Sequence, residues 1–393
     1  MLRVFLRLGV TSFGGPIAHL GYFRAEAVAR RGWMTDAEYA DLVALSQFLP
    51  GPASSQVGFG IGLHRAGMRG ALAAFAGFTL PSAMLMVTFA FGASWFSGTV
   101  AEGVLLGLGI VAVAIVAQAV LGMARTLAPD RQRASIAVVA AAAALLIPFA
   151  WGQLAAIVFG ALAGLLVCRG QGAGAAADSD DRNAPARVTR VWGAICLAVF
   201  ALIFVAAPLL AHTLRESGFA LFDAFYRAGS LVFGGGHVVL PLLQSSVVES
   251  GWVPMGTFLE GYGAAQAVPG PLFTFAAHLG AASTVGPGGA LGALIALAAI
   301  FLPGFLLLLG VLPFWHSVRE RIWARSAMYG ANAAVVGVLA GALYTPVFTS
   351  AITGVGPFVL ALACFVLLIV WKLPPWTVVV AGAAGGVLLA YLA

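Results

Sequence analysis

Two Pro-Gly-Pro triplets, 219 residues apart, most restrict how this chain of 393 residues can fold. Pro50-Gly51-Pro52 follows the stretch QFL, and Pro269-Gly270-Pro271 follows the matching stretch QAV. A second pair of motifs precedes them, since FLRLGVTSFGG at 5–15 matches FYRAGSLVFGG at 225–235. Paired arginine, glutamine and proline positions at nearly one offset are not expected by chance in an apolar chain. The sequence therefore predicts two copies of one unit.

The composition assigns both copies to a membrane. Hydrophobic residues make up 61% of the chain and charged residues 9%, whereas soluble domains carry about 25% charged residues. These values exclude a cytosolic enzyme and a disordered protein. The net charge of +6 does not indicate a partner nucleic acid, because the basic residues lie in short loops between apolar runs, as orientation signals do. The three cysteines form no CxxC pair, so we expect no disulfide, no metal site and no cofactor.

Each copy has the same order of elements. A short apolar helix ends at the Gly-Gly, an amphipathic stretch follows, and two half-length helices flank the Pro-Gly-Pro. Four longer apolar segments close each copy, at 70–93, 100–122, 135–150 and 152–168 in the first and at 288–313, 325–346, 355–371 and 375–392 in the second. A full crossing of the hydrocarbon core takes about 20 residues. The segments around each Pro-Gly-Pro are therefore predicted to form re-entrant hairpins.

Four regions follow from this order: an N-terminal repeat (1–168), a flexible cytoplasmic linker (169–190), an extra transmembrane helix (191–211) and a C-terminal repeat (212–393). The extra helix reverses the second copy across the membrane, and loop charges agree. The loops at 283–288 and 346–354 lack the basic residues of their first-copy equivalents, while basic residues fill loops that are neutral in the first copy. The fold class we predict is an all-α polytopic membrane protein with two inverted-topology repeats and broken, re-entrant helices, multi-pass in the cell inner (cytoplasmic) membrane.

Broken helices in inverted repeats usually place a substrate site near the bilayer midplane. After each Pro-Gly-Pro a helix restarts, so its free N–H groups point back toward the break and attract anions. The predicted substrate-binding set combines both pairs of breaks with nearby hydroxyls and two arginines: Arg7, Gly14, Gly15, Pro50, Gly51, Pro52, Ser54, Ser55, Arg227, Gly234, Gly235, Pro269, Gly270, Pro271 and Thr274. The alternative is that each Pro-Gly-Pro only makes a tight turn.

The two arginines of this set occupy matching positions on the helix that leads to each Gly-Gly. A guanidinium offers forked donors that suit oxyanions. Two helix ends supply only about half a positive charge each, so a bound dianion needs at least one arginine nearby. We therefore expect Arg7 and Arg227 to approach the breaks. The alternative is that these side chains snorkel to the lipid headgroups. For Arg7, snorkelling and substrate binding are equally expected.

Five further residues are candidates for coupling or gating. Asp41 and Glu260 match in the helix before Pro-Gly-Pro, where a carboxylate can carry a proton or pair with an arginine; a charge partner or a solvated surface is the alternative. Gln47 and Gln266 lie one turn before the break. Their side chains can donate to a ligand or hydrogen-bond to backbone groups that the break leaves free. His237 follows the second Gly-Gly, as His19 follows the first without aligning, and a structural hydrogen bond is the commoner role for such histidines.

The motif segments themselves resemble a known family. FGGPIAHLGYFR at 13–24, ALSQFLPGPASSQ at 44–56, FGGGHVVLPLL at 233–243 and AQAVPGPLFTF at 265–275 are similar to the chromate ion transporter family in its long, two-domain form, over nearly the whole chain. The resemblance implies a secondary active carrier that exports chromate and confers chromate resistance, with sulfate as a related dianion. It also implies that the residues of the two Phe-Gly-Gly and two Pro-Gly-Pro segments bind the substrate.

Three classes of function are weighed against one another. An oxyanion transporter, for chromate or alternatively sulfate, is favoured over a small-anion channel. An intramembrane enzyme is disfavoured because the sequence offers no nucleophile–base or metal set. The expected partners are the oxyanion and the lipid bilayer but no nucleic acid, and the sequence leaves a homodimer open.

The inverted arrangement predicts the outcome of cysteine labelling. In a background without the three native cysteines, single cysteines replacing Arg69 and Thr284 should react with an impermeant thiol reagent from opposite faces of sealed vesicles, because these residues lie in matching loops. Labelling of both from the same face would contradict the inverted arrangement.

Overall fold

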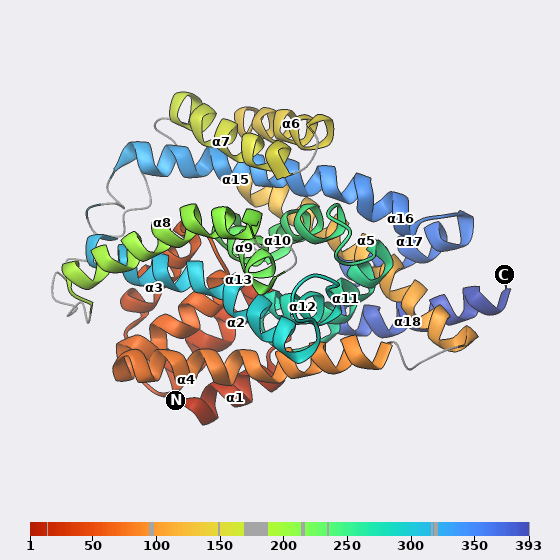
Figure 1. Cartoon of the computed structure of the whole chain (residues 1–393), viewed down its shortest axis with the longest axis horizontal. Helices are drawn as coiled ribbons and strands as arrows, with labels where there is room; N and C mark the ends of the chain where they lie inside the picture. The colour runs from red at the N-terminus through yellow and green to blue at the C-terminus, as the bar shows by residue number, and fades with distance from the viewer. Residues whose placement is uncertain are drawn as a thin grey trace.

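The computed structural model describes residues 1–13, 15–93, 98–147, 150–168, 188–213, 217–233, 236–315, 317 and 321–392. Three predicted site residues, Gly14, Gly234 and Gly235, and 169–187 of the predicted linker lie outside this part. Every regular element in these ranges is a helix, and 6 helices are long and apolar enough to cross a membrane. The prediction of an all-α polytopic membrane protein is confirmed (Figure 1).

The helices follow the predicted order in both copies. The first copy contains α1 (Leu2–Thr11), α2 (Gly15–Arg24), η1 (Ala25–Arg30), α3 (Asp36–Phe48), α4 (Ala53–Ala93), α5 (Thr99–Leu127), α6 (Arg131–Leu146) and α7 (Ala150–Val167). The extra helix is α8 (Arg190–Thr213). The second copy contains α9 (Gly218–Leu231), η2 (Gly236–Val238), α10 (Val239–Leu243), η3 (Gln244–Val248), α11 (Met255–Ala267), η4 (Leu272–Thr274), α12 (Phe275–Ala282), α13 (Gly289–Val311), η5 (Leu312–Phe314), α15 (Ile322–Ala342), η6 (Leu343–Phe348), α16 (Thr349–Ala351), α17 (Val355–Ile369) and α18 (Pro375–Leu392).

The helix before each Pro-Gly-Pro has 13 residues in both copies. At 1.5 Å per residue it is about 20 Å long, well short of the hydrocarbon core. In the first copy a capping box starts this helix, since the Glu38 N–H donates to Thr35 Oγ1 (3.2 Å) and the Thr35 N–H donates to Glu38 Oε2 (2.7 Å). It ends just ahead of Pro50, where the residue before a proline is disfavoured in helical conformation. These lengths agree with the predicted hairpins.

The long helix after the first Pro-Gly-Pro is not continuous. Its backbone leaves the helical region at Ala66 and Gly67, although the two parts of α4 follow each other without a loop. At the matching place in the second copy, residues 283–288 form a loop between α12 and α13. In each copy, therefore, the backbone is interrupted between the second helix of the hairpin and the long helix that follows it.

The closing helices of each copy pack against the other copy. Helices α6 and α7 lie along α15, and α17 and α18 lie along α5 (Figure 1). Small residues allow these close approaches: Gly160 and Gly164 face Gly330, while Gly103 and Gly107 face the Gly382–Gly386 stretch of α18. Helix α15 is the counterpart of α5, and α17 and α18 are the counterparts of α6 and α7. Each copy therefore makes the same contacts with the other, so the two copies are related by a pseudo-twofold axis.

Within each copy the first helix crosses the long helix at a glycine. A Cβ on Gly9 of α1 would lie 2.6 Å from the carbonyl oxygen of Gly77 in α4. At the matching place, a Cβ on Gly229 of α9 would collide with the carbonyl oxygen of Ile300 in α13. The extra helix α8 breaks the symmetry, because it packs on α9 and α13 and has no counterpart in the first copy.

This crossing predicts a stability difference. Gly229→Ala should lower the free energy of unfolding by about 1–3 kcal/mol, because the added methyl meets backbone that cannot move aside. The matched control is Gly21→Ala, since a Cβ there has no atom within 4 Å and alanine favours a helix. Thermal unfolding in detergent measures both, and equal melting temperatures for the two variants would contradict the crossing.

Candidate functional site

Each Pro-Gly-Pro is hydrogen-bonded to the other copy. The Gly51 N–H donates to the carbonyl oxygen of Val232 (2.8 Å), and the Gly270 N–H donates to the carbonyl oxygen of Ser12 (3.0 Å). Ser12 and Val232 are equivalent, since each immediately precedes its Phe-Gly-Gly. The two kinds of break that the sequence singled out therefore meet across the pseudo-twofold axis.

The central glycine of each triplet is required at this junction. Gly51 and Gly270 have φ angles of +119° and +103°, which side chains other than hydrogen rarely allow. A Cβ on Gly51 would also lie 3.0 Å from Cα of Gly304, and one on Gly270 would lie 2.8 Å from Oγ of Ser82. Gly304 and Ser82 follow the matching prolines of the two long helices, so this contact too is made once by each copy.

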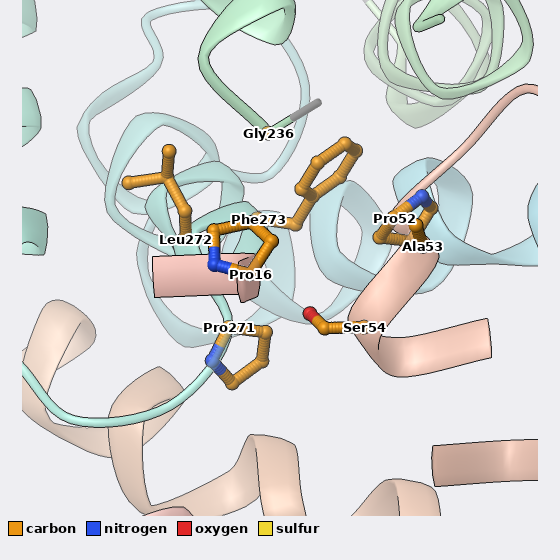
Figure 2. A pocket seen from close by; sticks show the side chains of 8 residues that line it. All are labelled: Pro16, Pro52, Ala53, Ser54, Gly236, Pro271, Leu272 and Phe273. Atoms are coloured by element: carbon orange, nitrogen blue, oxygen red, sulfur yellow. The ribbon is translucent and has the colours of Figure 1, made fainter. Parts of the chain in front are cut away.

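A cavity of about 20 Å³ lies between the breaks (Figure 2). Its lining consists of four equivalent pairs, one residue of each pair from each copy: Pro16 with Gly236, Pro52 with Pro271, Ala53 with Leu272, and Ser54 with Phe273. The cavity therefore lies on the pseudo-twofold axis. Its volume admits about one water molecule, so a tetrahedral oxyanion enters only if the breaks move apart.

The two halves of the cavity differ in polarity. Ser54 in the first turn of α4 aims its hydroxyl into the space, where the second copy places the ring of Phe273 (Figure 2). Ser55 is 2% exposed, and Thr274 turns its hydroxyl back to the Pro271 carbonyl oxygen (2.8 Å). The N–H groups of the first turn of α4 have no partner within that helix. The first copy therefore offers most of the donors at the axis.

Sequence reasoning missed Gln56, which ties the two copies together. This side chain is fully buried, and its Nε2 donates to the carbonyl oxygens of Gly304 (2.9 Å) and Pro50 (3.1 Å). Gly304 follows Pro303 in α13 and Pro50 begins the first Pro-Gly-Pro, so this one side chain joins the two copies at the junction. The sequence signal that could have identified Gln56 is its position in the first turn after Pro-Gly-Pro. The equivalent residue, Phe275, cannot make this bond.

The predicted approach of the arginines to the breaks is not found. Neither Arg7 nor Arg227 lines the axial cavity. Arg7 is exposed on α1. Arg227 pairs with Asp223 one turn earlier (Nε to Oδ1, 2.9 Å), and its guanidinium lies over the ring of Phe204 in α8 (5.3 Å to the centroid). The match at 220 residues identified α1 and α9 as equivalent helices, but neither arginine lines the cavity.

The other predicted residues are dispersed. On α3, Asp41 is half-buried and Gln47 is exposed. On α11, Glu260 and Gln266 are half-buried, and Nε2 of Gln266 has no hydrogen-bond partner among the described residues. His237 is bonded through Nδ1 to the hydroxyl of Tyr262 (2.7 Å). Gly15 begins α2 with a φ of +75°.

Charged residues of the first copy gather away from the axis, where α2 continues into η1. Glu26 accepts from Arg31 (2.7 Å) and Arg30 (3.1 Å). Burial by itself raises the pKa of Glu26, but these bonds and charges outweigh it and hold the pKa below its usual value. Among the residues that the structure describes, no group of three His, Cys, Asp or Glu side chains could hold a metal ion.

Comparison with known proteins agrees with the duplication. A family model described as Chromate transporter matches two regions, 1–165 and 219–387. A "Chromate transport protein" of Pseudomonas aeruginosa is 29% identical over 85% of this chain and 77% of its own. One of Cupriavidus metallidurans is 28% identical over 100% of this chain and 92% of its own, and a "Probable chromate transport protein" of Synechococcus elongatus is 28% identical over 87% and 83%. No solved structure matches significantly.

The hydrogen bonds of Gln56 predict that removing this side chain weakens the contact between the two copies. Gln56→Leu removes both hydrogen bonds, and a typical hydrogen bond contributes about 0.5–1.5 kcal/mol to stability. Thermal unfolding in detergent should therefore show a clearly lower melting temperature. Gln47→Leu, at an exposed position three residues before Pro50, is the matched control. A Gln56 variant as stable as this control would contradict the bridging role.

Proposed function

The chain belongs to the chromate transporter family, and on this premise we propose that it is a secondary active transporter that carries chromate out of the cell across the cytoplasmic membrane. Six apolar helices of spanning length supply the membrane domain. The proposed substrate site is the axial cavity between the duplicated breaks. Outward flux would make the protein a determinant of chromate resistance.

The observation that carries this proposal is that both kinds of break, from both copies, meet at one cavity. Matching residues line it in pairs, and each Pro-Gly-Pro amide bonds to the other copy. In transporters built from inverted repeats, a site at the repeat interface stays in place while the repeats rock around it. The inverted orientation of the two copies is part of this proposal.

The small volume of the cavity favours a carrier over a channel. A space of about 20 Å³ closes the axis to an oxyanion, whereas a pore conducts through a continuous path. The reciprocal bonds of Gly51 and Gly270 provide contacts that can break and re-form as the copies move. In this proposal the dianion is held by the hydroxyl of Ser54 and by the N–H groups after each Pro-Gly-Pro, with no arginine at the axis.

Uptake of labelled chromate into oriented vesicles tests the transport function. Wild-type protein should accumulate chromate under an imposed pH or voltage gradient and saturate with concentration, and excess sulfate should compete. Vesicles without the protein are the control. A flux that does not saturate and follows only the chromate gradient would favour a channel, and the absence of any flux would contradict the proposal.

Removal of the axial hydroxyl should weaken transport specifically. A hydrogen bond to a charged group contributes about 1.5–3 kcal/mol, so Ser54→Ala should lower kcat/KM for chromate by about 10- to 100-fold. The matched control is Ser135→Ala, because Ser135 is exposed on α6 and bonds only to its own helix. Equal kcat/KM values in the two variants would remove Ser54 from the site.

A further inference from the structure

A dianion at the axial cavity lacks compensating charge. None of the residues that line the cavity carries a charged side chain, and Arg7 and Arg227 lie elsewhere (Figure 2). The two helix starts at the breaks contribute about half a positive charge each. Roughly one negative charge therefore remains, and desolvating it without a partner is costly. The missing charge has to come from a group just behind the lining.

His19 lies directly behind the polar half of the cavity. It is 1% exposed, and Nδ1 lies 3.5 Å from Oγ of Ser54, a lining residue. Its Nε2 lies 3.2 Å from the carbonyl oxygen of Ser12, the same oxygen that accepts from the Gly270 N–H. The ring also packs edge-on against Phe78 (5.1 Å between centroids). One imidazole thus contacts residues next to both breaks of the first copy, and it shares the Ser12 carbonyl oxygen with the Pro-Gly-Pro of the second copy.

The acceptor at Ser12 determines the protonation pattern of this imidazole. A carbonyl oxygen only accepts, so Nε2 carries the proton of neutral His19 and Nδ1 is an acceptor. The Ser54 hydroxyl then donates to Nδ1 and presents lone pairs to the cavity, which repel an anion. If Nδ1 takes up a proton, it donates to Ser54 Oγ instead. The Ser54 proton is then free to point into the cavity, and the ring carries a full positive charge.

Resting on the proposed transport function, we propose that His19 binds a proton from solvent together with the anion, so that this transporter couples oxyanion binding to proton binding. The proton adds to Nδ1, no covalent bond breaks, and the Ser54 hydroxyl turns to donate to the anion. His19 acts through Ser54 and is a positioning residue. At the equivalent positions the second copy has Val239 and Phe273. Its own histidine at this place, His237, follows the lining residue Gly236 and is bonded to the hydroxyl of Tyr262.

The elements around His19 carry other ionisable groups, several of which have partners of their own. On the elements around it these groups are Arg3, Arg7, Tyr22, Arg24, Glu26, Arg30, Arg31, Asp36, Glu38, Tyr39, Asp41, His64, Arg65 and Arg69. Arg24 pairs with Asp36, Glu26 with Arg30 and Arg31, and Glu38 with His64, while the Tyr39 hydroxyl donates to the Leu20 carbonyl oxygen. Within the described part of the chain, no carboxylate forms an ion pair with His19.

Chromate binding to the purified protein as a function of pH tests the coupling. Titration calorimetry between about pH 7 and about pH 9, where neutral histidine predominates, should give a wild-type Kd that falls on acidification, by at most about tenfold for each pH unit. Repeating the titration in buffers of different ionisation enthalpy should report net proton uptake on binding, at most about one proton per anion. A Kd independent of pH, with no proton uptake, would overturn the coupling while leaving transport itself in place. If the wild type binds no chromate at any pH, the proposed function and this inference both fail.

Variants identify the group that takes the proton. His19→Asn should bind chromate with a Kd that no longer varies with pH, whereas His64→Asn should keep the wild-type slope, because His64 lies on α4 away from the cavity. Asp41→Asn and Glu260→Gln should also keep it. A wild-type slope in His19→Asn, or its loss in Asp41→Asn or Glu260→Gln instead, would overturn the assignment.

A second substitution separates positioning from a structural role of the imidazole. Ser54→Ala retains His19 but removes the hydroxyl that it orients. Its Kd should exceed that of the wild type by about tenfold at the acid end and by less at the alkaline end, where the wild-type hydroxyl faces His19. A Ser54→Ala variant with the wild-type Kd at every pH would show that the proton does not act through this hydroxyl.

Discussion

The structure depends on two hydrogen bonds that exchange partners between the copies. Each Pro-Gly-Pro glycine donates its amide to the carbonyl oxygen just ahead of the other copy's Phe-Gly-Gly. Proline on both sides removes the competing amides, and the glycine conformation lets the backbones approach. Because four backbone breaks meet there, their unpaired polar groups satisfy one another in an environment that offers little water. The cavity, its pairwise lining and the bridge of Gln56 all follow from this junction.

Close packing of glycines keeps the two copies together around that junction. Helices α6 and α7 of the first copy lie along α15 of the second, and α17 and α18 of the second lie along α5 of the first, with glycine facing glycine. In lipid no hydrophobic force drives such contacts, so close van der Waals approach has to supply the attraction. Neither copy is complete without the other, because α5 of the first copy and α15 of the second are each covered by the closing helices of the other copy. Movement at the axis therefore takes place inside an interlocked bundle.

Departures from symmetry give the site its chemistry. The copies match in backbone but differ in the side chains beside the axis, where Ser54 and His19 of the first copy have Phe273 and Val239 as their equivalents in the second. The extra helix α8 covers α9 and α13 and lies over the guanidinium of Arg227, and it has no counterpart beside α1. A twofold site would bind an anion equally from both sides. Among the residues that line the cavity, the hydroxyl donor comes from the first copy, through Ser54.

The sequence alone determined the membrane class, the two copies, and the positions of the helices and breaks, because composition and the interrupted apolar runs are local properties. It also located the Pro-Gly-Pro glycines, because a glycine between two prolines indicates a backbone conformation that other residues rarely adopt. Only the tertiary structure decided that each break bonds to the other copy, that Gln56 bridges them, and that His19 lies behind Ser54. It also showed that neither Arg7 nor Arg227 lines the cavity, since the direction of a side chain depends on which helix packs beside it. A repeat fixes equivalence between positions, but contact between them is set by packing across the chain.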